Sequence, residues 1–181
     1  MDITIQQPIL SFRVEYDIST PWRNYYASRK FPWSRSIQLF AADDRQTLPA
    51  RVRQLFYWIR PKFDFELAGG KTYHFRGADF ARTVFTCEGN GERLLLFAHK
   101  GLHYSIYQND LQIAAFSKNR LKIGDGDRFA IRLNHNANVI LVICMVLAID
   151  ASLYASPVAI QYDIGLTGIE RNPRDKTWTP S

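Results

Sequence analysis

The stretch Asn138–Asp150 reads NVILVICMVLAID, and it decides the fold. Its apolar residues run without interruption from Val139 to Ile149, and Asp150 ends the run. A membrane-spanning helix needs about 20 predominantly apolar residues, whereas a run of about 10–14 is more typical of a helix buried in a globular core. We therefore predict a core helix over about residues 137–155. A transmembrane span is the alternative interpretation, and we do not expect it.

A buried strand is a third interpretation of the same run, because its first half is rich in β-branched residues. The run is long for a strand, and Met145, Leu147 and Ala148 in its second half favour a helix. Asn136 or Asn138 can cap the amino end of that helix. Such a helix has no polar stripe, so other elements must surround it on every side.

The rest of the chain consists of short segments that alternate apolar and polar residues and end in turn residues. A barrel of about eight strands is filled by its own side chains, and a helix about 10–12 Å wide needs a larger one. The predicted fold is mainly β, a closed antiparallel β-barrel of about 10–12 strands around one central hydrophobic α-helix. The clearest predicted strands are Pro8–Tyr16, Ser36–Ala41, Val52–Tyr57, Lys62–Leu67, Thr72–Arg76, Arg82–Cys87, Arg93–Ala98, His103–Tyr107, Gln112–Phe116 and Arg128–Leu133. Segments before Ser36 and near Leu121 are expected to add one or two more.

A chain of 181 residues is most simply one domain. We assign residues 1–155 to the barrel and its helix, and residues 156–181 to a tail outside the barrel or partly disordered. Cys87 and Cys144 form no disulfide framework, which suits a reducing compartment. The amino terminus shows no secretory signal pattern. The expected location is therefore cytoplasmic, with peripheral membrane attachment as an extension of it.

No nucleotide-binding or catalytic motif and no metal-ligand spacing is found in the sequence. We accordingly predict no enzyme, no cofactor and no metal site. The formal net charge of +6 favours a phosphate-bearing partner, either a membrane surface or a nucleic acid. Two groups of cations lie around proposed hairpins, and they form the candidate site for an anionic headgroup: Arg51, Arg53, Arg60, Lys62, Lys118, Arg120 and Lys122.

Four segments together resemble the tubby C-terminal-like superfamily, in its scramblase and LURP-one-related branch. They are RKFPWSRSIQLFAADD (29–44), IRPKFDFELAGG (59–70), HYSIYQNDLQIAAF (103–116) and NVILVICMVLAIDASLY (138–154). The resemblance implies a closed barrel around a central hydrophobic helix, and it covers about residues 25–155. The chain departs from the calcium-binding members before the helix, where RFAIRLNHNAN (128–138) has no carboxylates.

The resemblance and the basic hairpins together lead to the expected function, a non-enzymatic binding module that engages anionic lipid headgroups at a membrane surface. A regulatory module that binds protein or nucleic acid is the first alternative. A phospholipid scramblase-like protein is the second, and the short apolar run argues against it because scrambling requires membrane insertion.

Overall fold

The computed structural model describes residues 1–8, 13–30, 35–44, 46–55, 60–79, 82–120, 126–153 and 174–181. Twelve strands and one helix follow one another along these residues. The strands are β1 (Asp2–Gln7), β2 (Arg13–Ser19), β3 (Tyr25–Lys30), β4 (Ser36–Ala41), β5 (Ala50–Gln54), β6 (Lys62–Leu67), β7 (Lys71–Gly77), β8 (Val84–Gly89), β9 (Glu92–His99), β10 (His103–Gln108), β11 (Leu111–Arg120) and β12 (Asp127–Leu133). The helix is α1 (Val139–Leu153).

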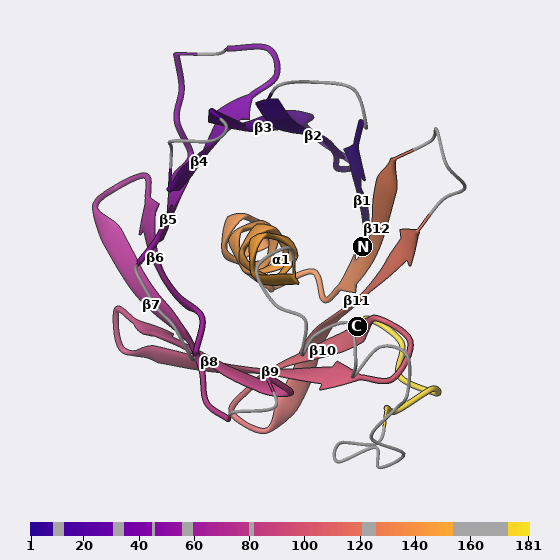
Figure 1. The fold of residues 1–181 in the computed structure, drawn as a ribbon. Coiled ribbons are helices and arrows are strands. Elements are labelled where there is room, and N and C mark those ends of the chain that lie inside the picture. The colour runs from indigo at the N-terminus through magenta and orange to yellow at the C-terminus, as the bar shows by residue number, and fades with distance from the viewer. Residues whose placement is uncertain are drawn as a thin grey trace.

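The strands form a closed antiparallel barrel in which each strand pairs with its neighbours in sequence. The barrel closes where β1 pairs with β12, with Ile3 opposite Ile131 and Ile5 opposite Phe129. Closure leaves no strand edge exposed in the described sheet, which removes the template for edge-to-edge aggregation. Viewed down its axis, the barrel surrounds α1 on all sides (Figure 1).

The helix begins as the sequence indicates, because the Asn138 side chain accepts a hydrogen bond from the Leu141 backbone N–H at 3.1 Å. Every residue from Leu141 to Ala151 is buried. Alternate residues of the strands point inward against the helix, such as Phe63 and Phe65 of β6. None of the helices in the described residues has the length and apolar character needed to cross a membrane.

The predicted fold class is confirmed, including the strand number and the central helix. The first predicted strand, Pro8–Tyr16, is wrong in its bounds: β1 ends at Gln7, directly before Pro8, and β2 begins at Arg13. Proline has no backbone N–H to donate to a strand ladder, which is consistent with β1 ending before it. The segment before Ser36 does contain a further strand, β3, whereas residues 121–125 lie outside the described residues.

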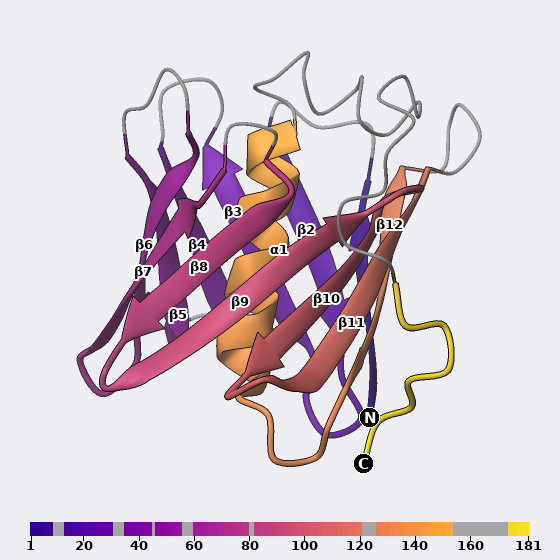
Figure 2. The ribbon, with the colours of Figure 1, turned by 90° about the horizontal axis from the view of Figure 1, so that it is seen from below.

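The two ends of the barrel differ in their relation to α1 (Figure 2). The helix starts at the end that holds the β2–β3, β4–β5, β6–β7, β8–β9 and β10–β11 turns, which we name the entry end. It finishes at the opposite end, where β11 ends and β12 begins, which we name the exit end. Residues 174–181 lie outside the barrel, and Ser181 exchanges hydrogen bonds with Asn134 and His135 at the entry end.

Candidate functional site

The predicted cations Arg51 and Arg53 lie on the outer face of β5, as their spacing indicated. Each pairs with the carboxylate directly opposite it on β6, Arg51 with Glu66 at 3.5 Å and Arg53 with Asp64 at 2.9 Å. Their charges are therefore largely neutralised by the neighbouring strand. The exposed Arg51–Glu66 pair contributes little to stability.

Asp64 lies between two partners on neighbouring strands, because it contacts His74 of β7 at 2.8 Å as well as Arg53 of β5. Partial burial on its own would raise the pKa of Asp64, but the hydrogen bonds with His74 and Arg53 outweigh it and lower this pKa below its usual range. Asp64 therefore stays ionised near neutral pH, and it holds the Arg53 guanidinium close to the barrel wall.

The next outward-facing residue pair of β6 and β7, towards the exit end, consists of two cations. Lys62 of β6 stands directly opposite Arg76 of β7, and both side chains are exposed on the outer face. Neither makes an ion pair with a carboxylate among the residues that the structure describes. Like charges placed opposite each other on a sheet are destabilising. We name these two adjacent exposed cations the Lys62–Arg76 pair.

The predicted site residue Arg60 is half-buried beside this pair, just before Pro61 at the exit end. Its Cβ lies close to Gly77, at the end of the strand that carries Arg76. The hairpin thus brings Arg60, Lys62 and Arg76 together. Sequence reasoning named the first two and missed Arg76.

The second predicted cluster is arranged differently from the sequence-based expectation. Lys118 points into the barrel and is buried, with its side chain 3% exposed, so it does not stand on the outer surface where a headgroup would meet it. The reason is the strand alternation, since Ala114, Phe116 and Lys118 share the inner face of β11. The side chain of Arg120 and all of Lys122 lie outside the described residues.

Lys118 instead forms the polar centre of the core at the exit end. Its ammonium donates to Asp150 of α1 at 2.7 Å and to Asp127 of β12 at 2.6 Å. The Tyr16 hydroxyl of β2 donates to the second oxygen of Asp150 at 2.8 Å. Phe129 lies under the ammonium, 5.3 Å from ring centroid to nitrogen. These contacts tie the last turns of the helix to three strands, and we name them the helix anchor.

Burial raises the pKa of Asp150, whereas Lys118 and Tyr16 act in the opposite direction. An aspartate near a helix carboxyl terminus is also disfavoured by the helix dipole. The positive charge of the Lys118 ammonium thus stabilises the ionised Asp150 carboxylate at this buried position.

Thiol chemistry and metal binding find no support in the described residues. Cys87 and Cys144 are free and buried. Burial raises the pKa of Cys87 to about 12, and it also raises the pKa of Cys144. A reactive thiolate is therefore not formed at neutral pH. No group of three or more His, Cys, Asp or Glu side chains that could hold a metal ion occurs in the part of the chain that the structure describes.

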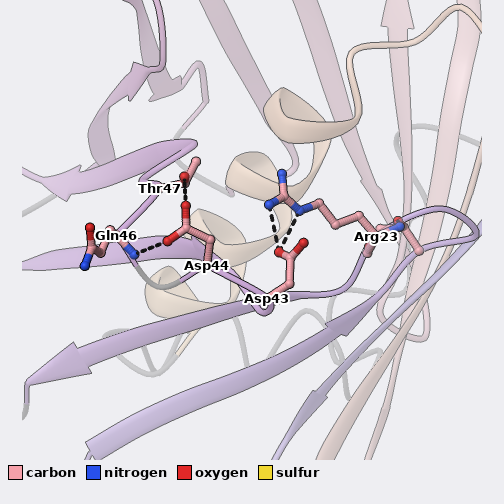
Figure 3. Close-up of polar contacts among 6 residues, drawn as sticks. Arg23, Asp43, Asp44, Gln46 and Thr47 are labelled. Atoms are coloured by element: carbon pink, nitrogen blue, oxygen red, sulfur yellow. Dashed lines mark hydrogen bonds and ion pairs between the residues drawn. The ribbon is translucent and has the colours of Figure 1, made fainter.

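The entry end carries ion pairs and hydrogen-bonded turns. Arg23 of the β2–β3 turn pairs with Asp43 of the β4–β5 turn at 2.7 Å, which links the two turns (Figure 3). The hydrogen bond from Arg23 lowers the pKa of Asp43. Asp44 accepts hydrogen bonds from the Gln46 backbone and the Thr47 hydroxyl within its own turn. These contacts hold the β2–β3 and β4–β5 turns in place.

No protein-family model matches the chain, and no curated protein or solved structure matches it either.

Proposed function

We propose that the protein is a non-enzymatic binding module of the tubby-like type, which engages anionic lipid headgroups at a membrane surface. The observation that carries this proposal is the Lys62–Arg76 pair, two exposed cations opposite each other without a carboxylate partner among the described residues. A like-charge pair costs folding free energy, and an anion shared between the two cations would offset that cost.

The fold supports the same proposal. The twelve-stranded barrel with its apolar central helix agrees with the architecture implied by the sequence resemblance to the tubby C-terminal-like superfamily. The Lys62–Arg76 pair also stands on a rigid part of the wall, because Phe63 and Phe75, their chain neighbours, are buried in the core behind it. A site on paired strands keeps its cations in place before the ligand arrives, which lowers the entropic cost of binding.

Replacing both Lys62 and Arg76 by alanine is expected to weaken binding to anionic vesicles about thirty-fold. Each cation near a negatively charged bilayer contributes about 1 kcal/mol, and 1.4 kcal/mol corresponds to a factor of ten. The measurement is a vesicle titration of the purified protein, with phosphatidylcholine vesicles that contain phosphatidylserine or a phosphoinositide. The same double variant should keep or slightly gain thermal stability, because a repulsive pair is removed.

The matched control is Lys71→Ala with Arg93→Ala, which removes the same net charge at the entry end. We expect this control to lose little affinity. Equal loss in both double variants would mean that net charge alone governs binding and would contradict a site at the Lys62–Arg76 pair. A duplex DNA titration run in parallel tests the alternative partner, since a steep salt dependence on DNA without vesicle binding would favour nucleic acid.

A further inference from the structure

The formal charges divide unequally between the two ends of the barrel, counting the turns and the last two residues of each strand. At the exit end, the acidic residues that the structure describes are Asp79 and Asp127. Asp79 accepts hydrogen bonds from the backbone of Thr83 and Val84, and Asp127 pairs with the buried Lys118. Both carboxylates are therefore engaged by local contacts.

Cations follow the rim of the same end from β3 round to β12. Those with described side chains are Arg29, Arg35, Arg60, Lys62, Arg76, Arg82, Lys100 and Arg128, besides Arg53, which pairs with Asp64. Arg128 lies on β12, across the barrel from β6, and it is exposed (Figure 1). The excess of positive charge is therefore distributed around the rim rather than confined to one hairpin.

The entry end has the opposite balance. Its described acidic residues are Asp2, Asp43, Asp44, Glu66, Glu88, Glu92 and Asp110, and its described cations are Arg23, Arg51, Lys71, Arg93 and Arg132. Arg23, Arg51 and Arg93 each pair with a carboxylate. The described residues thus carry a charge separation along the axis of α1, and such a field orients a protein near a charged surface.

We propose that the described cations of the exit end dock against an anionic bilayer surface, with α1 steep to the membrane plane and the entry end facing water. This inference rests on the proposed function and adds the docking geometry to it. Cations that are spread around a barrel end are suited to a charged plane, because a plane presents anionic groups to several of them at once. A nucleic-acid duplex is a narrow rod and would engage a stripe of such a rim rather than its full circumference.

The geometry can be tested with single fluorescent labels, because both native cysteines are buried and their thiols are protonated at neutral pH. Asn119→Cys and Ala78→Cys place a label at the exit end, and Ala68→Cys and Leu111→Cys place one at the entry end. All four positions are exposed and uncharged, so the substitutions leave the rim cations intact. Each labelled full-length protein is mixed with vesicles of phosphatidylcholine and phosphatidylserine.

We expect both exit-end labels to shift their emission to the blue and to be quenched by lipids that carry a headgroup-level quencher. Both entry-end labels should respond as they do in buffer. A response at the entry end, or at one exit-end position alone, with binding intact, would overturn end-on docking and leave the lipid-binding proposal standing. Absence of any vesicle binding would overturn both proposals, and an exit-end response to duplex DNA alone would assign the rim to nucleic acid.

A second pair of variants tests the rim independently of labels. Lys100→Ala with Arg128→Ala removes two cations away from the β6–β7 hairpin, and end-on docking predicts a loss of about thirty-fold, as for the Lys62–Arg76 pair. A site confined to β6 and β7 predicts almost no loss, and that result would overturn the inference.

Discussion

Replacing Lys118 by methionine is expected to lower the free energy of unfolding by about 3–5 kcal/mol. Asp150 is completely buried, and the variant would leave its carboxylate with the Tyr16 hydroxyl but without a counter-charge. Removing one partner of a buried ion pair is costly because the remaining charge stays out of water. Urea unfolding followed by circular dichroism measures the loss, and Lys62→Met is the matched control on the surface.

A second substitution separates the buried charge from lost packing. Lys118→Met combined with Asp150→Leu removes both members of the pair, and it should recover most of the lost stability, since apolar replacements of a complete buried pair are often neutral or stabilising. A double variant as unstable as Lys118→Met would show that the helix anchor acts through shape rather than charge.

The pH dependence of Lys118→Met follows from the same contacts. Burial raises the pKa of Asp150 in the folded chain, and loss of Lys118 removes a group that lowers it. The folded state then binds a proton more readily than the unfolded state, so stability increases as the pH falls towards the ordinary range of an aspartate, about 4. The difference from the unmodified protein should therefore be smaller near pH 5 than at pH 7, and an unchanged difference would contradict an ionised Asp150.

Phe75→Ala is expected to lower the free energy of unfolding by about 3–5 kcal/mol, the range for removing a phenylalanine from a core. Phe75 is fully buried on β7 and stacks between Phe65, at 5.5 Å, and Phe85, at 5.3 Å between ring centroids. Its loss leaves a cavity in the inner wall behind the Lys62–Arg76 pair. Denaturant unfolding gives the magnitude.

The outer-face control for this substitution is Phe97→Ala. Phe97 is partly exposed on β9 and contacts Tyr107 edge-on at 5.5 Å. A smaller loss is expected there because less apolar surface returns to water. An equal loss at both positions would contradict the description of Phe75 as a fully buried core residue.

The fold could be predicted because two physical constraints agree. The run from Val139 to Ile149 is too short to span a membrane easily and too apolar to lie on a surface, so it had to be enclosed. The alternating segments around it, such as Lys62–Leu67, could supply the enclosing wall. Strand bounds were harder to predict, because the alternation in Pro8–Tyr16 overlaps only β2, from Arg13 onward, and the pattern did not indicate β1.

The candidate site was harder to predict because charge pairing depends on strand register. The Ala68–Gly70 turn sets Leu67 opposite Lys71, and counting outward from it places Lys62 opposite Arg76. The pairing of these two cations can thus be deduced from the position of the turn. The position of Lys118 had a signal too, since Phe116 two residues before it is a core residue of β11. Its partner Asp150 lies far away in sequence, and no local pattern links the two.

The most direct test of the lipid-binding proposal is flotation of the purified, detergent-free protein with vesicles. Neutral phosphatidylcholine vesicles are compared with anionic ones, at low and at physiological salt. We predict flotation with anionic vesicles, reduced by salt because exposed charges are screened over about 8–10 Å at these ionic strengths. No flotation of a monodisperse protein with anionic vesicles at low salt would contradict the proposal, and salt-resistant flotation with neutral vesicles would contradict the electrostatic basis given to it.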